Sequence, residues 1–562
     1  MNRPINTLPR SKESFDLARS WLRTCLLYHP KCQRGFGLSD KFMPSRVIKL
    51  DATSGVLRMR LVESLPKPEP YATLSYCWGG DQELKTMRDS IESFKIDMPV
   101  HELPATIRDA AEVALQLNIP NLFVDAFCII QDDPNDIAHQ LAQMPTIYSE
   151  SMVTIAGSRA KSVDQGFLHE REPLPPFFER GEVYQLPFCS PTGEIGSAIL
   201  LPFHFDSVTE PLEDRAWALQ ERLLSPRIID YGTHQTFWHC WCVNNVRDGW
   251  LEAGFMGRNF EAQVPGLFQK PIKSLAPPKE RSPASISSSS LHESELGEIL
   301  NSWNTVVRIY SARKLSFPAD KLPAIAAAAA RFAIVLDDQY RCGLWKSYLQ
   351  YQILWYIDCK DDEQLRSRTA YKAPSWSWAA IDGSVWIESV GWHSNYTFCL
   401  EILECEVRLA SDHLPYGAVK SGFITAKGRI KPAMLGRRHD HDYWKNGGEW
   451  FLENTTREGH IIEPIADVHI DALEPNLQGT WIQSIRVTLL EVLTEMESHQ
   501  PVGLILCEVK PETFRRIGMF NCDHGRYIQF SQTDQEKERN RIRVEEGKRL
   551  FHDSDRKTLK II

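Results

Sequence analysis

Blocks of apolar and polar residues along the first 160 positions predict strands that alternate with helices. Residues 71–77 and 152–156 are short β-prone runs, and residues 122–130 (LFVDAFCII) are almost continuously apolar, which is typical of a strand covered on both faces. Helical spacing of apolar residues begins at Pro104 and again at Pro134, where the preceding aspartate is a suitable N-cap. The alternation predicts a parallel sheet with flanking helices.

The pattern changes along the rest of the chain. Residues 46–65 and 226–240 each predict a pair of strands around a glycine. Residues 322–336 form an Ala-rich apolar run that we interpret as a buried helix, because it is shorter than the ~20 residues that span a bilayer. From residue 385 to about 530, β-prone segments and turns dominate, which predicts a second, mainly β domain.

Composition narrows the class of protein. The chain has 562 residues, of which 43% are hydrophobic and 24% charged, with a formal net charge of −9. An acidic chain has no overall attraction to nucleic acid or to anionic membranes, so neither is predicted as a partner. The first 20 residues lack an apolar signal segment and the cysteine count is 13, which together predict a cytoplasmic protein with reduced thiols.

The same features divide the chain into six parts. They are a helical lead-in (1–45), an α/β domain (46–265), a disordered linker or insertion rich in Pro and Ser (266–298), a helical and Trp-rich segment (299–384), a mainly β domain (385–532) and a charged tail (533–562).

Common nucleotide-binding and hydrolase signatures are absent, including G-x-G-x-x-G, G-x-x-x-x-G-K-[ST], H-E-x-x-H and G-x-S-x-G. Candidate ligand-binding residues follow the predicted strands instead. They are Trp78, Gly79, Gln131, Asp132 and Arg159. The carboxyl ends of parallel strands meet at one sheet edge, so these side chains are expected to converge on a nucleotide- or sugar-sized ligand. A turn at Gly79 and simple helix capping are the structural alternative.

Two carboxylates are candidate catalytic groups. Asp125 lies within the apolar run and must be paired or have a raised pKa, with Arg215 or Arg227 as partner. Glu221 lies in a predicted helix that also carries Arg215 and Trp217, both candidate ligand-binding residues. Salt bridges within a docking helix are the alternative interpretation.

Cys25, His29 and Cys32 have the spacing C-x₃-H-x₂-C of a partial zinc site. A fourth ligand would come from elsewhere, and the candidates are His239, Cys240 and Cys242. Ordinary buried thiols are the simpler interpretation, so no metal is predicted.

Four blocks, in order, resemble the fungal HET (heterokaryon incompatibility) domain. They are residues 71–79 (YATLSYCWG), 103–110 (LPATIRDA), 123–133 (FVDAFCIIQDD) and 215–227 (RAWALQERLLSPR). Further matches extend the resemblance from about residue 20 to 383. Phe123 stands where many members have Trp, and the last 180 residues resemble no family we can name.

The resemblance implies a fold similar to Toll/interleukin-1 receptor (TIR) domains and a role in non-self recognition and programmed cell death. Such an effector would engage protein partners or self-associate. Some TIR domains cleave NAD with a glutamate, so NAD is a candidate substrate and Glu221 the candidate glutamate, while no cofactor is predicted.

A second alternative is recruitment to natural-product biosynthesis. HET-type genes also occur in secondary-metabolism clusters, and 16 Trp and 25 Phe could line an apolar pocket. The activity would then be that of a cyclase or isomerase acting on an apolar small molecule. A non-catalytic interaction scaffold is the remaining alternative.

Overall fold

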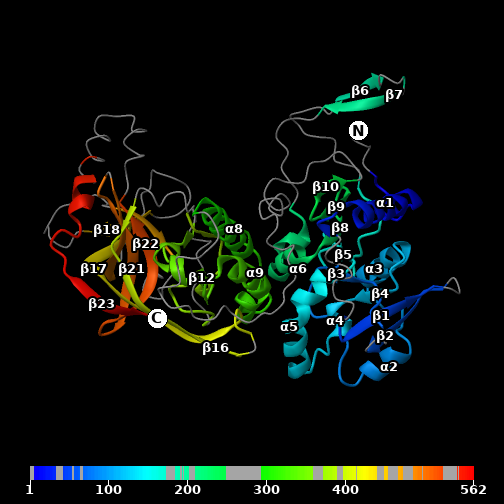
Figure 1. Cartoon of the computed structure of the whole chain (residues 1–562), viewed down its shortest axis with the longest axis horizontal. Helices are drawn as coiled ribbons and strands as arrows, with labels where there is room; N and C mark the ends of the chain where they lie inside the picture. The colour runs from blue at the N-terminus through cyan, green and yellow to red at the C-terminus, as the bar shows by residue number, and fades with distance from the viewer. Residues whose placement is uncertain are drawn as a thin grey trace. The chain divides into compact units, whose positions relative to one another are not determined.

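The structure is a computed structural model that divides the chain into two compact units, Met1–Lys273 and Ser274–Ile562 (Figure 1). It describes residues 6–32, 42–52, 56–63, 67–172, 184–189, 193, 195–200, 209–247, 293–357, 371–388, 396–412, 414–438, 449–453, 466–472, 485–496, 498–522, 541 and 544–562. The division after Lys273 falls inside the predicted linker 266–298, of which residues 266–292 lie outside the described residues.

An eight-stranded sheet forms the centre of the N-terminal unit, in the order β10-β9-β8-β5-β3-β4-β1-β2. The four central strands β8, β5, β3 and β4 are parallel, and antiparallel strands extend both edges. The bounds are β1 (Arg46–Asp51), β2 (Arg58–Glu63), β3 (Tyr71–Ser75), β4 (Asn121–Phe123), β5 (Val153–Ala156), β8 (Arg227–Tyr231), β9 (Thr236–Cys240) and β10 (Val243–Arg247). The predicted α/β fold with a parallel sheet is confirmed.

Helices connect and flank these strands. The bounds are α1 (Lys12–Tyr28), α2 (Ile91–Ile96), α3 (Ala105–Gln116), α4 (Asp125–Cys128), α5 (Pro134–Ser149) and α6 (Ala216–Leu224), with a 3₁₀ turn η2 (Pro211–Asp214) before α6. Helix α1 packs beside β9, and α2 packs beside β2 (Figure 1). The start of α5 is as predicted, because the Asp133 side chain accepts hydrogen bonds from the backbone of Asn135 and Asp136. A separate hairpin pairs β6 (Tyr184–Cys189) with β7 (Ile195–Leu200).

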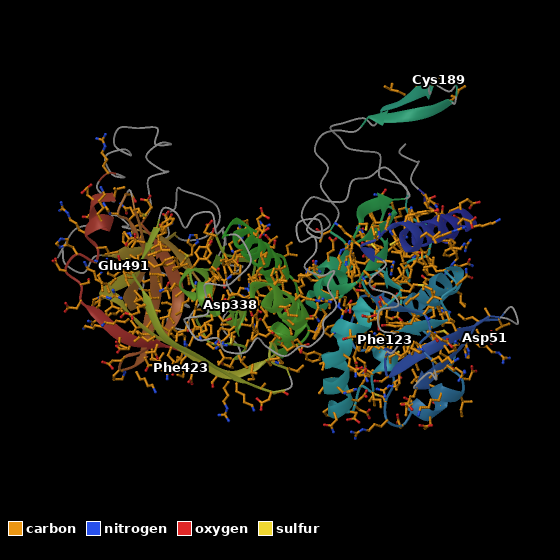
Figure 2. The ribbon with its side chains drawn as sticks, in the orientation of Figure 1. Asp51, Phe123, Cys189, Asp338, Phe423 and Glu491 are labelled. Atoms are coloured by element: carbon orange, nitrogen blue, oxygen red, sulfur yellow. The ribbon has the colours of Figure 1, made fainter. Side chains whose placement is uncertain are left out.

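The apolar run 122–130 was predicted as one strand, and this is wrong. Strand β4 ends at Phe123, and helix α4 begins at Asp125. Phe123 lies in the interior of the unit, whereas Asp51 at the end of β1 is exposed (Figure 2). A buried helical turn and a buried strand have the same continuous apolar pattern, so periodicity cannot separate them. Asp125 therefore stands just beyond a strand end rather than within the sheet.

The first part of the C-terminal unit is helical and rich in buried tryptophan. Its helices are α8 (Glu293–Ser311), α9 (Ala326–Leu336) and α10 (Leu349–Gln352). Residues 293–298 of the predicted linker are thus helical, as the first turns of α8. Trp303 and Trp345 are fully buried and meet edge to face with ring centroids 5.3 Å apart. Around Trp376 and Trp378 the chain forms turns and a 3₁₀ helix (Trp378–Ala380).

The second part is a nine-stranded sheet in the order β15-β20-β21-β22-β23-β17-β16, with β18 beside β17 and β19 beside β22. An additional pairing of β17 with β20 closes a ring of strands. The bounds are β15 (Tyr396–Phe398), β16 (Glu401–Leu409), β17 (Val419–Arg438), β18 (Glu449–Glu453), β19 (Asp467–Ile470), β20 (Ile485–Glu495), β21 (Pro501–Lys510), β22 (Thr513–Asn521) and β23 (Arg556–Ile561). The predicted mainly β region is confirmed.

The predicted charged tail 533–562 is wrong at its end. Residues 556–561 form β23, which pairs with β17 and β22 and buries Leu559 and Ile561. These two apolar residues alternate with lysine, so one face of a short strand reaches the core although the segment is highly charged. Two small two-stranded sheets, β11 (Tyr340–Arg341) with β12 (Leu344–Trp345) and β13 (Tyr356–Ile357) with β14 (Val385–Trp386), complete the described strands of this unit. None of the described helices is long and apolar enough to cross a membrane.

Candidate active site at the strand ends

The order of the parallel strands creates a natural crevice between β3 and β5. From β3 the chain passes to β4 on one side, and from β4 it crosses over β3 to β5 on the other. Neighbouring strands whose connections leave in opposite directions open a crevice at their carboxyl ends, where ligands of α/β proteins commonly bind. Ser75 and Ala156 are paired at these ends, so they mark the floor of the crevice.

Helix α6 places Glu221 at this position. The hydroxyl of Ser75 donates a short hydrogen bond to Glu221 Oε2, across 146 positions of sequence. A row of buried hydroxyls fixes the end of the same helix. Thr154 Oγ1 lies 2.6 Å from Ser225 Oγ, which in turn donates to the Glu221 carbonyl oxygen at 2.7 Å. The glutamate is therefore held over the strand end by both its side chain and its backbone.

Asp125 faces the same crevice from the start of α4. Its Oδ2 accepts a hydrogen bond of 3.0 Å from the Trp78 indole, and its Oδ1 accepts one of 2.7 Å from the Ala126 backbone. Tyr76 also hydrogen-bonds to this carboxyl group, and Gln82 donates to the Tyr76 hydroxyl at 2.9 Å. The loop after β3 thus supplies two aromatic side chains that orient one carboxylate.

Arg215 is the positive charge shared by the two carboxyl groups. One of its terminal nitrogens donates to the Tyr76 carbonyl oxygen. Burial raises the pKa of Glu221 from 4.5 to about 7, although Arg215 and the hydrogen bond from Ser75 oppose that rise. Burial also raises the pKa of Asp125, again against Arg215. One guanidinium is therefore not enough to keep both carboxyl groups ionised near neutral pH. We call Ser75, Tyr76, Trp78, Asp125, Arg215 and Glu221 the strand-end cluster.

Four of the predicted site residues come together in this cluster, and the others do not join it. The side chain of Gln131 donates to the carbonyl oxygens of Asp125 and Ile129, so it supports the α4 turn from behind. Asp132 is exposed and accepts a hydrogen bond from the Arg88 backbone. Arg159 donates to the His169 carbonyl oxygen.

Gly79 and Trp217 complete the predicted set. Gly79 has a φ of +79°, and an added Cβ would lie 2.2 Å from the Cβ of Ser162, so glycine is required for close packing of this loop. Trp217 is half-buried on α6, four residues before Glu221.

Ser75, Tyr76 and Tyr148 belong to the site but were missed in the sequence. Ser75 and Tyr76 end an apolar strand with polar side chains, which is the signal that could have found them. Tyr148 lies on helix α5; its hydroxyl donates to the Leu74 carbonyl oxygen at 3.2 Å, and its presence beside Glu221 lowers the pKa of that carboxyl group.

Residues 71–221 match the family model of the heterokaryon incompatibility protein (HET). Residues 71–221 of the chain form a HET domain. The family predicted from the four sequence blocks is therefore confirmed. No curated protein and no solved structure matches the chain, so the expected likeness to TIR domains stays a prediction.

The HET domain contains the whole strand-end cluster, from Ser75 to Glu221. A carboxyl group whose pKa lies near 7 can both accept and donate a proton at neutral pH, which general acid–base catalysis requires. Its neighbour Arg215 can bind an anionic group such as a phosphate. The cluster is thus chemically suited to hydrolysis of a polar, anionic substrate.

A second group of reactive side chains lies where the end of helix α1 meets the end of strand β9. The ligand atoms of Cys25, His29, Cys32 and Cys240 all lie within 4.8 Å of one another. We call these four residues the thiol–imidazole cluster. The structure thus brings together the three weak metal candidates of the lead-in and selects Cys240 from the three candidate fourth ligands.

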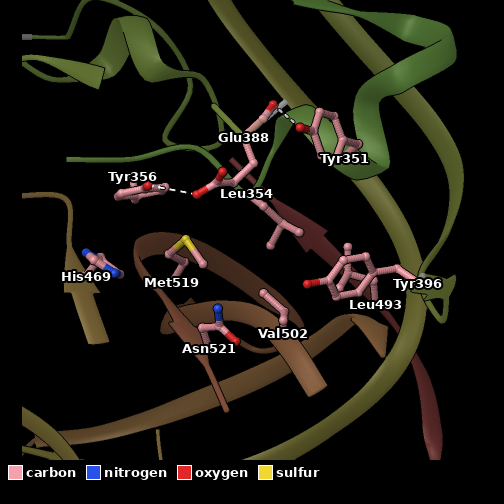
Figure 3. Close-up of a pocket in the computed structure, with 10 residues that line it drawn as sticks. All are labelled: Tyr351, Leu354, Tyr356, Glu388, Tyr396, His469, Leu493, Val502, Met519 and Asn521. Atoms are coloured by element: carbon pink, nitrogen blue, oxygen red, sulfur yellow. Dashed lines mark hydrogen bonds between the residues drawn. The ribbon is translucent and has the colours of Figure 1, made fainter. Parts of the chain in front are cut away.

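The C-terminal unit contains a cavity of about 230 Å³, shown in Figure 3. It is lined by Tyr351, Leu354, Tyr356, Glu388, Tyr396, His469, Leu493, Val502, Met519 and Asn521. The Tyr356 hydroxyl donates to Glu388 Oε1 at 2.9 Å across its wall. The volume is below the roughly 300–1,000 Å³ of most drug-sized ligand sites. The fully buried tryptophans near it, such as Trp355 and Trp376, pack in the core and do not line this cavity.

Proposed function

We propose that this protein acts in heterokaryon incompatibility, as an effector of non-self recognition that arrests growth and kills the cell. The observation that carries the proposal is the HET-family match to residues 71–221, which spans the strand-end cluster from β3 to Glu221. The C-terminal β unit is the proposed sensor for a protein partner or for a second copy of the chain.

Expression of the full chain from an inducible promoter in a filamentous fungus tests this role. After induction, the cells should stop growing, and a vital dye that living cells exclude should enter them. A Glu221→Gln variant at equal abundance should be harmless, because it removes the proton-transfer group and keeps the shape of the side chain. An Asp81→Asn variant removes an exposed carboxylate from the same loop region and should remain toxic. Normal growth with abundant folded wild-type protein would reject the proposal.

Hydrolysis of NAD is the second candidate, and the raised pKa of Glu221 favours it. In such a reaction the bond between ribose and nicotinamide breaks and nicotinamide leaves with the bonding electrons, while a water adds its hydroxide to the ribose carbon and gives its proton to the Glu221 carboxylate. A carboxylate beside the sugar stabilises the cationic transition state, as in other glycoside hydrolyses. Arg215 would hold the pyrophosphate.

Incubation of purified protein with NAD distinguishes the two proposals. Nicotinamide released by the wild type and not by Glu221→Gln would make the effector an enzyme. Cell death without any nicotinamide release, at full protein abundance, would leave the effector role and reject the hydrolase.

A biosynthetic cyclase or isomerase receives less support from the cavity of the C-terminal unit. Such an enzyme needs a large dry pocket that folds an apolar substrate. The cavity of about 230 Å³ is small and contains Glu388, His469 and Asn521 among its lining residues.

A further inference from the structure

The thiol–imidazole cluster is assembled by three separate parts of the N-terminal unit. Cys25 lies in the last turn of α1, and His29 is the residue that caps this helix. Cys32 follows in a tight turn, in which its backbone N–H donates to the His29 carbonyl oxygen at 3.0 Å. The fourth member, Cys240, comes from the end of β9, more than 200 positions later in the sequence.

Local geometry explains why these residue types face one another. Residues four apart share one face of a helix, so Cys25 and His29 point the same way. Side chains on a strand alternate, and Trp238 on β9 packs against Trp21 of α1 with ring centroids 6.5 Å apart. Cys240, two residues after Trp238, therefore also points toward α1. His239 points to the opposite face, where its ring lies 3.9 Å from Asp230.

The donor set is that of a closed structural zinc site. Three cysteines and one histidine form one of the common tetrahedral zinc sets. Sulfur atoms bound to zinc at about 2.3 Å lie about 3.8 Å apart in a tetrahedron, which fits ligand atoms that all lie within 4.8 Å of one another. His29 Nδ1 lies 3.3 Å from Cys240 Sγ, as two ligands of one small ion would. Calcium and magnesium prefer oxygen ligands and do not suit this set.

A buried arginine completes the charge balance. Arg227 is fully buried and lies directly opposite Cys240 in the β8–β9 pairing. Its Nε donates to Cys25 Sγ at 3.3 Å, and its other nitrogens donate to the carbonyl oxygens of Met152 and Cys32. Among the described residues, no carboxylate forms an ion pair with Arg227.

Three thiolates and a neutral imidazole around a divalent ion leave one net negative charge. The Arg227 guanidinium would neutralise it and hold a thiolate through a hydrogen bond, as outer groups do in metal sites. A buried cation without a carboxylate is otherwise costly. The arginine is thus a second observation that points to anionic sulfur, independent of the spacing of the four ligands.

We infer that Cys25, His29, Cys32 and Cys240 bind one structural zinc ion, which fastens helix α1 to strand β9 of the sheet. All four coordination positions come from the protein, so the ion has no open position for a substrate. Binding converts three thiols to thiolates and releases their protons to solvent. The site lies outside residues 71–221, so this inference does not depend on the proposed function.

Metal analysis of the purified full chain is the direct test. Inductively coupled plasma mass spectrometry should find about one zinc per chain in the wild type. A Cys240→Ser variant should retain less than about a tenth of that zinc, because a closed four-ligand site loses one ligand. The matched control is Cys242→Ser, which changes a thiol two residues later in the same hairpin and should retain the full zinc content.

Cobalt substitution keeps the inference testable if Cys240→Ser fails to fold. Wild-type protein exchanged with Co²⁺ should show sulfur-to-cobalt charge-transfer absorption and the visible bands of tetrahedral coordination. Removal of zinc with a chelator should lower the melting temperature, and zinc should restore it while magnesium should not.

Three results would overturn the inference. One is a wild-type zinc content no higher than that of Cys240→Ser. Another is an octahedral cobalt spectrum without sulfur charge transfer. The third is an intact mass that shows a disulfide between two of the three cysteines in freshly prepared protein, because a disulfide removes two of the thiolate ligands.

Discussion

Each unit of this protein places an arginine beside carboxylates, and the two groups differ in how completely their charges are paired. In the C-terminal unit, Arg516 makes two hydrogen bonds of 3.0 Å to Asp471, and both side chains are at most 1% exposed. In the N-terminal unit, Arg215 serves both Asp125 and Glu221, and the pKa of each carboxyl group is raised. The first group is a complete ion pair, and the second is short of positive charge.

The remaining contacts reinforce this difference. Arg516 also donates to the carbonyl oxygens of Ile353 and Trp355, and its guanidinium lies 3.5 Å from the centre of the Trp355 ring. The planar guanidinium group thus joins strands and loops of the core through hydrogen bonds. The strand-end cluster instead keeps a carboxyl group that changes protonation near neutral pH. Arginine–carboxylate groups of similar composition thus differ in whether a carboxyl group is left with a raised pKa, which is a feature typical of functional sites.

The largest expected effect is on the complete pair. Replacement Arg516→Met leaves the buried Asp471 carboxylate without its partner, which should cost about 3–5 kcal/mol of unfolding free energy. Urea unfolding followed by circular dichroism would measure it as a lower midpoint for the C-terminal unit. The double variant Asp471→Leu with Arg516→Met should recover part of the loss, since no unpaired charge remains. A single variant within about 1 kcal/mol of the wild type would contradict the structural role.

The difference between the two groups also decides what the sequence could predict. Glu221, Asp125, Arg215 and Trp78 were found because each follows a strand or lies in a block of the HET family. Local patterns of this kind are visible within a few residues. The match of Asp471 with Arg516 has no such signal, because the two residues lie 45 positions apart, Asp471 just after strand β19 and Arg516 on the neighbouring strand β22.

Prediction of the fold from the sequence has the same limit, because local patterns are visible in the sequence and pairings between distant segments are not. Helix α5 and strands β3 and β5 follow from caps and periodicity. Closure of the C-terminal ring depends on the pairing of β17 with β20, whose register is set by side-chain packing between distant segments. Cys240 was one of three candidate ligands. It is selected only because the side chains on its face of β9 point toward helix α1.

The second prediction concerns pH and the N-terminal unit. Because the pKa of Glu221 rises from 4.5 in the unfolded chain to about 7, the folded protein holds a proton that the unfolded chain releases. The stability from the protonated carboxyl group is complete below pH 4.5 and is lost as the pH rises through about 7. The loss should be on the order of 2–3 kcal/mol, and Glu221→Gln should abolish it.

Melting temperatures measured from pH 5 to 8 would test this loss of stability, which appears as a negative slope of melting temperature against pH. Asp81→Asn is the matched control, since the Asp81 side chain is 83% exposed and its removal should leave the slope unchanged. If the melting temperature of Glu221→Gln fell with pH as steeply as that of the wild type, the pH dependence would belong to another group. Glu221 would then not differ from the fully paired Asp471 in the way proposed.

The third prediction uses the glycine pair of the loop that carries Trp78. Gly79 and Gly80 both have positive φ, of +79° and +144°, so alanine is strained at either position. An added Cβ at Gly79 would also collide with Ser162, whereas at Gly80 it meets nothing within 4 Å. Gly79→Ala should therefore destabilise the protein by about 1–2 kcal/mol more than Gly80→Ala, and it should displace Trp78 from Asp125. Equal melting temperatures for the two variants would show that the loop relaxes freely.

The smallest expected effect comes from removing single hydroxyl groups on strand β3, one that contacts Glu221 and one that does not. Ser75→Ala removes the hydrogen bond that Glu221 accepts, which should cost about 1 kcal/mol and raise the pH at which the stability is lost, because that bond lowers the pKa of Glu221. Thr73→Val removes a hydroxyl two residues earlier on the same strand, where it contacts Thr154 and not the carboxyl group. The two variants should lose similar stability, and only Ser75→Ala should move the pH midpoint. A shift of the midpoint in both would mean that the hydroxyl row, and not Ser75 itself, sets the proton affinity of Glu221.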